Sequence, residues 1–169
     1  METNALPKYD ASDNPTNCCP RFNSTGWDEQ ELHFKDKLFV KATTRSIFHI
    51  PLNMGSVYPK TYEAIAQAGA MAADELIVLS HDPTPWTGEH YFSASKDVPG
   101  QTMVRMTGDY LTKVFEGPYK NMPLWEKEMD AFVQSQGKHT KKHYFFYTTC
   151  PKCAKFYGKN YVVAVAEIQ

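Results

Sequence analysis

The sequence predicts an α+β fold in which two strand–helix–strand–strand units follow one another and form a curved, mainly antiparallel sheet with two main helices that cover one side of it. Two observations carry this prediction. Apolar residues recur at helical spacing in two segments, 57–68 and 122–136, and each segment follows a short apolar strand and ends at a glycine. Landmarks in the two halves also keep a nearly constant offset of about 67–70 residues.

The chain is long enough for one domain with a sizeable core, so a single domain is expected over residues 1–169. We divide it into an N-terminal arm, 1–35, a first repeat, 36–99, and a second repeat, 100–169. The arm is polar and lacks helical periodicity, and we expect a wrapping segment with Phe22 and Trp27 as apolar anchors.

In the first repeat, residues 38–50 are rich in β-branched and aromatic side chains and predict a strand or strand pair. The helix at 57–68 follows, and Gly69 suits a left-handed C-terminal cap. Residues 76–79 predict a short buried strand, and residues 80–88 predict a turn. The segment 89–95 alternates between two faces, as a half-buried strand does.

The second repeat begins after a hinge at 97–100, which contains Pro-Gly. Gly117-Pro118 ends its central strand, because neither residue continues a regular ladder well. Asn121 is a suitable N-cap for the helix at 122–136, and Gly137 suits its C-terminal end. The strands of this repeat are predicted at 102–107, 110–115, 144–149 and 161–168.

Composition excludes several classes of protein. The net charge is −1, the isoelectric point is about 6.6 and Lys and Arg form no run, which argues against a nucleic-acid partner. Apolar stretches stay well short of a membrane span, and residues 1–16 lack the apolar core of a signal peptide. We therefore expect a cytoplasmic protein without a membrane partner. Aromatic residues make up 14% of the chain, including ten tyrosines, which favours an aromatic-lined pocket.

A strand ending in Gly117-Pro118-Tyr119, followed by a helix with Trp125 on its apolar face, resembles the second half of the GyrI-like small-molecule-binding family. This module also forms the effector-binding domains of multidrug-responsive bacterial regulators. The resemblance covers residues 104–168 and, more weakly, 38–98. It implies a ligand-binding cleft between the two halves. Because the arm cannot supply a helix-turn-helix domain, the expectation is a stand-alone module that is a monomer or weak homo-oligomer.

The resemblance implies polyspecific binding of lipophilic, flat, often cationic small molecules, such as drugs, dyes or toxins, for sequestration or sensing. Aromatic faces attract cations, and a carboxylate in an apolar cleft gains from a cationic guest. The usual family acid falls at Phe145, two residues before Tyr147, so Glu89 or Glu116 would have to replace it. The expected ligand-binding residues are Trp86, Glu89, Tyr91, Tyr110, Phe115, Glu116, Tyr119, Trp125, Phe145, Tyr147 and Tyr161.

A first alternative is an enzyme. One branch of the resembled family looks like hydrolases that open strained, electrophilic rings in lipophilic toxins. Here Glu89 or Glu116 would act as general base on water. Ser80-His81-Asp82 is not expected to form a catalytic triad, because neighbours in sequence cannot converge as the three groups must.

A second alternative rests on the cysteines. Cys18, Cys19, Cys150 and Cys153 supply four thiolates, the number that tetrahedral zinc requires. A metal or redox protein, a thiol pair or disulfide that pins the arm to the last hairpin, and chemically inert cysteines all remain open. No other cofactor is expected.

Overall fold

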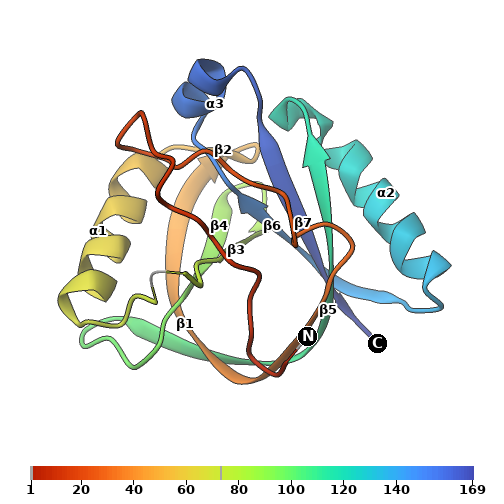
Figure 1. The fold of residues 1–169 in the computed structure, drawn as a ribbon, viewed down its shortest axis with the longest axis horizontal. Coiled ribbons are helices and arrows are strands. Elements are labelled where there is room, and N and C mark those ends of the chain that lie inside the picture. Colours follow the sequence, from red (N-terminus) through yellow and green to blue (C-terminus); the bar gives the residue numbers. More distant parts are fainter. Residues whose placement is uncertain (1, 73) are drawn as a thin grey trace.

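The computed structural model describes residues 2–72 and 74–169, and its strands curl into an antiparallel barrel (Figure 1). The sheet has the strand order β2-β1-β4-β3-β6-β7-β5, and pairing of β1 with β5 closes all strands except β2 into the barrel. The strands are β1 (Glu31–Ile47), β2 (Ile50–Pro51), β3 (Val78–Thr84), β4 (Thr87–Ser93), β5 (Thr102–Glu116), β6 (Thr140–Tyr147) and β7 (Tyr161–Ile168). The helices are α1 (Met54–Gln67), α2 (Met122–Ser135), α3 (Pro151–Tyr157) and the 3₁₀ turn η1 (Tyr119–Asn121).

Barrel closure confirms the α+β class and the antiparallel sheet but corrects the arrangement. The order strand–helix–strand–strand occurs twice along the chain, as β1–α1–β3–β4 and β5–α2–β6–β7. These segments join through β1–β5 and β3–β6 pairs into one barrel. The sheet therefore does not form the expected cleft between two halves. The two helices were expected on one side of the sheet. Instead α1 and α2 lie at opposite sides of the barrel (Figure 1). Internal duplication stays a prediction.

Some element boundaries agree with the pattern of the sequence, whereas β1 begins at Glu31, inside the arm expected over 1–35, and the bounds of β3 and β6 differ from the expected 76–79 and 144–149 by up to five residues. The strand 161–168 is β7 as predicted, and both helices lie within three residues of their expected ends. Gly69 and Gly137 have φ of 62° and 71°, the left-handed conformation expected at helix ends. Two predicted strands, 102–107 and 110–115, form the single strand β5.

Two local expectations differ from the structure. The side chain of Asn121 makes no capping hydrogen bond to α2. The chain enters α2 from η1, so Asn121 already has helical dihedrals, whereas an N-cap residue needs an extended conformation. The helix α3 was not predicted, because its seven residues are too few to show a period.

Contacts between strands that are not neighbours identify the inside of the barrel. Tyr91 of β4 and Tyr110 of β5 have ring centroids 6.1 Å and 6.4 Å from that of Tyr144 on β6. In the described sheet, β3 separates β4 from β6, and β7 separates β5 from β6. These rings can therefore meet only across the interior. Because side chains alternate along a strand, this contact fixes the inward face of each strand.

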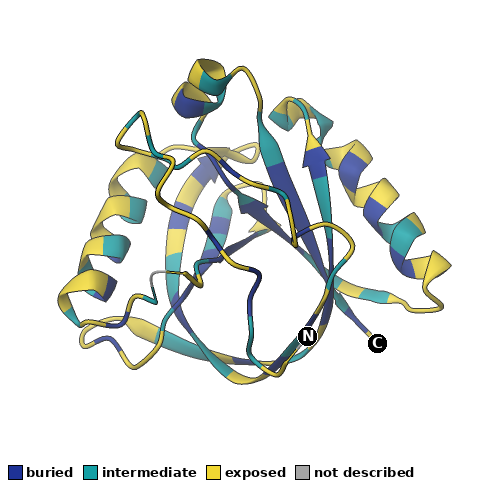
Figure 2. Cartoon of the chain, viewed as in Figure 1, coloured by how far each residue is buried: buried dark blue, intermediate teal, exposed yellow. Residues whose placement is uncertain are grey.

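The N-terminal arm closes one end of the interior, and the two expected anchors, Phe22 and Trp27, are buried there. Trp27 is 0% exposed, and its ring centroid lies 5.3 Å from that of Phe146. Phe22 packs beside it and contacts Tyr161 at 5.9 Å. Phe146 and Tyr144 share the inward face of β6. The side chains of the arm therefore fill the part of the barrel interior that surrounds Phe146. Figure 2 shows the buried residues of β6 and β7 behind the arm.

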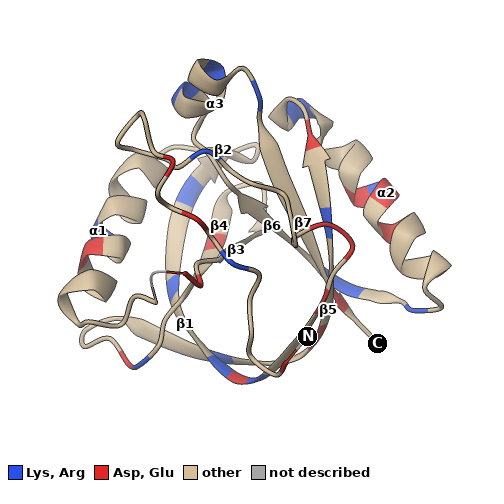
Figure 3. Ribbon diagram, viewed as in Figure 1, with Lys and Arg blue, Asp and Glu red and all other residues tan. Residues whose placement is uncertain are grey.

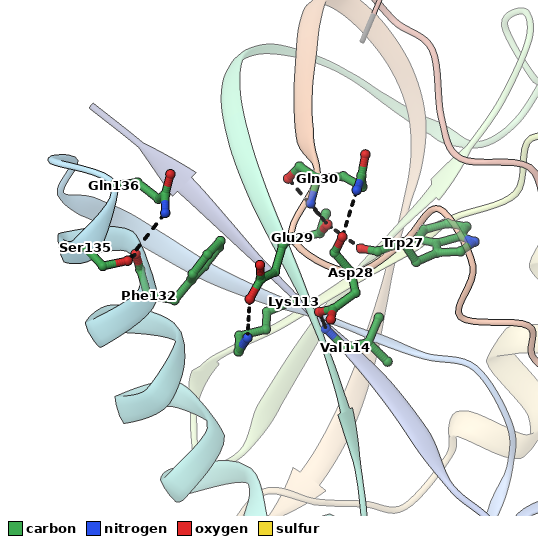
Figure 4. A network of polar contacts seen from close by, with 10 residues as sticks. Trp27, Asp28, Glu29, Gln30, Lys113, Val114, Phe132, Ser135 and Gln136 are labelled. Atoms are coloured by element: carbon green, nitrogen blue, oxygen red, sulfur yellow. Dashed lines mark hydrogen bonds and ion pairs between the residues drawn. The ribbon is translucent and has the colours of Figure 1, made fainter.

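Polar contacts fix the arm to β5 (Figure 4). The Thr112 hydroxyl donates to the Trp27 carbonyl at 2.5 Å, and the backbone N–H of Val114 donates to Asp28 Oδ1 at 2.8 Å. Glu29 forms an ion pair with Lys113 at 2.9 Å. The Lys113 ammonium also lies 5.0 Å from the centre of the Phe132 ring, which joins this junction to α2. The arm is thus an integral part of the barrel.

A second core lies between α2 and the outer face of β5, β6 and β7. Phe115 and Trp125 stack there, with centroids 5.6 Å apart and ring planes at 16°. Gly117 follows β5 with a φ of 144°, and a Cβ at this position would lie 3.2 Å from Asn121 Nδ2 and 3.4 Å from Trp125. The Gly-Pro corner is therefore required by local packing.

The Gly117→Ala variant should be destabilised by about 1–3 kcal/mol, because alanine is strained at this φ and its methyl crowds the Asn121 side chain. Urea unfolding monitored by circular dichroism measures the loss. Gly26→Ala, whose Cβ would meet nothing within 4 Å, is the control for backbone strain alone. Equal losses in the two variants would contradict the packing explanation.

Charge is mixed along the elements, and Figure 3 shows both signs on α2. None of the helices within residues 2–72 and 74–169 is long and apolar enough to cross a membrane.

Candidate active site

The barrel interior carries ionisable side chains at the end away from the Trp27 plug. We call this set the mouth cluster: Lys41, His81, Glu89, Tyr91, Tyr110, Lys142, Tyr144 and Glu167. Strand register brings its members together, because directly paired residues share a face. Lys41 pairs with Tyr91, His81 with Glu89, and Glu167 with both Tyr110 and Lys142.

Glu89 is the acidic centre of the mouth cluster. It forms an ion pair with Lys41 and accepts a hydrogen bond from the Tyr91 hydroxyl at 3.0 Å. Its side chain is 16% exposed, so water reaches it. Burial alone would raise the pKa of Glu89, but the hydrogen bonds from Lys41 and Tyr91 and the charges of Lys41 and Lys142 lower it below its ordinary value. Glu89 is therefore a carboxylate at neutral pH.

One ring nitrogen of His81 makes a hydrogen bond to the backbone, and the other makes none among the described contacts. Its Nδ1 lies 3.2 Å from the carbonyl oxygen of His143. A carbonyl can only accept, so Nδ1 carries the proton and Nε2 of the neutral ring has a lone pair. Burial, together with the charge of Lys142, lowers the pKa of His81 below 6.5. The ring is 6.0 Å from that of Tyr144, and it is neutral and able to accept a proton at pH 7.

Two tyrosine hydroxyls are available as donors. In the described part of the chain, the hydroxyls of Tyr110 and Tyr144 make no hydrogen bond, although both side chains lie in the interior. Burial and then the charge of Glu167 raise the pKa of each, so both stay protonated. Lys142 Nζ lies 5.0 Å from the centre of the Tyr144 ring and adds a positive charge. Donors and a cation here could stabilise a developing oxyanion.

A separate hydrogen-bonded group lies under α1. Ser80 Oγ and Tyr58 Oη lie 2.8 Å and 2.9 Å from His90 Nδ1, and Thr44 Oγ1 lies 2.8 Å from His90 Nε2. Ser80 is 3% exposed and His90 is 1% exposed, and burial lowers the pKa of His90 to about 4. Both ring nitrogens of His90 are hydrogen-bonded within this group, and the group lies on the opposite face of the sheet from the mouth cluster, so we interpret it as structural. Ser80 and His81 face opposite sides of β3, which confirms that Ser80-His81-Asp82 is no triad.

The ligand-binding residues predicted from the sequence lie in separate places. Glu89, Tyr91 and Tyr110 meet in the mouth cluster. A group packed with α2, on the opposite face of the sheet, consists of Phe115, Tyr119, Trp125, Phe145 and Tyr147. Tyr161 packs against the plug, and Trp86 is 53% exposed in the turn between β3 and β4. The structure therefore brings three of these residues together, and their roles stay predictions.

Glu116, the other carboxylate predicted as a general base, is exposed at the end of β5. It borders an open surface pocket that is lined by Glu116, Gly117, Pro118, Ala154, Lys155, Gly158, Lys159 and Asn160. Among the described contacts it has no ion pair or hydrogen-bond partner that would position it. Glu116 and Glu89 therefore do not converge on one site.

The four cysteines do converge. The sulfurs of Cys18, Cys19, Cys150 and Cys153 all lie within 4.8 Å of one another. Two come from the arm, and the other two are the N-cap residue of α3, Cys150, and Cys153 in its first turn, beyond the end of β6, whereas the mouth cluster lies near the start of β6. The cysteine group and the mouth cluster are therefore distinct sites.

Sequence reasoning missed Lys41, His81, Lys142, Tyr144 and Glu167. The available signal was alternation. Tyr144 lies two residues after Lys142, so the two share one face of the strand. The expected ligand-binding residues Phe145 and Tyr147 lie on the opposite face. His81 was assigned to a turn because the strand was expected to end at Leu79, whereas β3 continues to Thr84.

Comparison with solved structures identifies proteins that share this fold. The structure is similar to a crystal structure of a hydrolase from Listeria innocua, with a TM-score of 0.57 and 15% identity, covering 84% of this chain and 92% of that one. A second hydrolase structure from Listeria innocua has a TM-score of 0.58, 14% identity and the same coverage. At these identities the likeness shows the fold. No curated protein matches the chain.

The predicted resemblance to the GyrI-like family rested on the Gly-Pro-Tyr corner and the helix behind it, and comparison with family models contradicts it. Local packing of Gly117 against Trp125, and a hydrogen bond of 2.5 Å from the Tyr119 hydroxyl to the Thr149 carbonyl, explain that corner without a ligand. The family model described as "Bacterial hydrolase" matches residues 9–168. The chain belongs to this bacterial hydrolase family.

Proposed function

We propose that the protein adds water to a small, strained-ring electrophile bound in the barrel mouth, with His81 as general base. The observation that carries this proposal is the meeting of a neutral histidine with a free Nε2, two free tyrosine hydroxyls and a lysine ammonium at the solvent-reached end of the interior. Membership of a hydrolase family supports it.

The residues favour direct attack by water. The mouth cluster contains neither serine nor cysteine, so a covalent acyl intermediate on such a nucleophile has no starting point there. A three-membered ring such as an epoxide needs only a base for water and an acid for the ring oxygen. The interior offers both. The rings of Tyr91, Tyr110 and Tyr144 would suit an apolar or aromatic substituent.

The reaction balances as an addition of water. His81 Nε2 takes a proton from water while the water oxygen bonds to a ring carbon, and the carbon–oxygen bond of the ring breaks. The ring oxygen then takes the hydroxyl proton of Tyr144 or Tyr110, aided by the charge of Lys142. The proton on His81 returns to the tyrosinate through solvent. Glu89, across the strand pair from His81, is a positioning residue that stabilises the imidazolium.

A substrate panel tests the reaction class. Purified protein is incubated with styrene oxide, with an aliphatic epoxide and with phenyl acetate, and the products are followed by chromatography. The expected result is diol from the aromatic epoxide at a rate above that of buffer and heat-denatured protein. Turnover of the ester alone, or of no compound, would overturn the proposal. Glu116→Gln serves as the control variant and should retain full activity, because Glu116 is exposed and outside the mouth.

A further inference from the structure

The four cysteines form the densest group of potential metal ligands outside the mouth cluster. They are all the cysteines of the chain, and their sulfurs lie within 4.8 Å of one another. Four sulfurs at about 2.3 Å from a tetrahedral zinc ion are separated from one another by roughly 3.8 Å. The Cys18 and Cys19 sulfurs are 3.6 Å apart. The group therefore has the number, type and spacing of ligands that structural zinc requires.

We propose that Cys18, Cys19, Cys150 and Cys153 bind one zinc ion that fastens the N-terminal arm to α3. Disulfides explain the arrangement less well. A disulfide joins two sulfurs at about 2.05 Å and does not require the other two to approach it. Here both sulfurs of the arm meet both sulfurs of α3, which is the arrangement that a tetrahedral ion produces.

Hydrogen bonds around the sulfurs fit thiolate ligands. The backbone N–H of Cys150 donates to Cys19 Sγ at 3.4 Å, and the N–H of Cys153 donates to Cys150 Sγ at 3.5 Å. Thr16 Oγ1 lies 3.4 Å from Cys153 Sγ, within reach to donate to a thiolate. Such outer partners orient metal ligands and disperse their charge.

Contacts beside the four sulfurs already join the arm to α3. The Tyr157 hydroxyl donates to the Cys19 carbonyl at 2.5 Å, and the Arg21 guanidinium lies 4.8 Å from the centre of the Tyr157 ring. The arm continues from here to Phe22 and Trp27, which plug the barrel. A metal at this point would therefore hold the plug in place.

The proposed zinc is structural. Four protein ligands leave no open position for water or substrate. The mouth cluster lies near the start of β6 and the cysteines lie beyond its end, so this ion takes no part in chemistry at His81. The inference is thus independent of the proposed reaction.

Metal analysis tests the site. Untagged protein is purified anaerobically without chelators from zinc-containing medium, and zinc, iron and free thiols are counted. We expect about one zinc per chain. After replacement by cobalt(II), we expect the absorption of a tetrahedral tetrathiolate complex. Cys153→Ser should weaken zinc binding by at least about 100-fold, the upper end of the effect of losing an outer partner. Lys152→Ser, an exposed position between two ligands, should keep the metal.

Several results would overturn the zinc site. These are metal-free protein with four reactive thiols, a disulfide found by mass spectrometry in the anaerobic protein, or iron with acid-labile sulfide. Should the Cys153→Ser chain fail to fold, the zinc content and the cobalt spectrum of the wild-type protein still decide the question. Limited proteolysis supplies a further measure: removing zinc should expose the arm to cleavage, and restoring zinc should protect it.

Discussion

The His81→Gln variant should lose about 10²–10⁴-fold in kcat/KM for the epoxide that the wild type hydrolyses, the usual contribution of a general base. Glutamine can keep a hydrogen bond to the His143 carbonyl, but it cannot take a proton from water. Initial rates with the wild-type and variant proteins measure the loss.

His139→Gln is the matched control for this substitution. His139 is exposed, and its described hydrogen bonds are made by the backbone with Gln169. It should retain the wild-type rate. Thermal unfolding of both variants separates lost catalysis from lost folding. A fully folded His81→Gln protein with a rate close to that of the wild type would remove His81 from the mechanism.

Trp27→Ala should lower the free energy of unfolding by about 3–5 kcal/mol. The indole is 0% exposed and packs on Phe146 and Phe22, and its N–H donates to the Lys8 carbonyl at 3.2 Å. Removing it leaves a cavity at the plugged end and frees the arm. Urea titration followed by circular dichroism measures the loss.

Trp86→Ala provides the comparison, because Trp86 is 53% exposed and contacts Phe48 at the surface. Its unfolding free energy should change by less than about 1 kcal/mol. Similar values for the two tryptophan variants would mean that the arm contributes little to the barrel, contrary to the packing described above.

The local features of this fold could be predicted from the sequence, whereas closure of the barrel could not. Helical period, glycine caps and β-branched runs located α1, α2 and β7, because these signals depend on neighbours in the chain. Closure depends on pairing of β1 with β5 and of β3 with β6, strands far apart in sequence. Alternation fits a closed barrel and an open sheet equally well, and the cleft was expected only from the resemblance to the GyrI-like family.

The candidate site shows the same limit at the level of single residues. A period of two indicates that Lys142 and Tyr144 share one face and that Phe145 and Tyr147 share the other. It does not say which face turns inward. The barrel places Tyr144 inside, beside Tyr91 and Tyr110, and packs Phe145 against α2. His81 was missed because its role depends on a backbone carbonyl from β6, which no sequence pattern reveals.

The pH dependence of kcat/KM tests most directly whether His81 or a carboxylate accepts the proton from water. A base acts only when deprotonated, so activity falls as the pH drops through its pKa. The pKa of His81 is lowered from 6.5 by burial and by Lys142, and Glu89, Asp82 and the His143 carbonyl oppose this shift. We therefore predict that kcat/KM falls on the acid side with an apparent pKa below the ordinary 6.5 of histidine. A rate that holds steady down to pH 4.5 would contradict His81 as the base and would favour a carboxylate in its place.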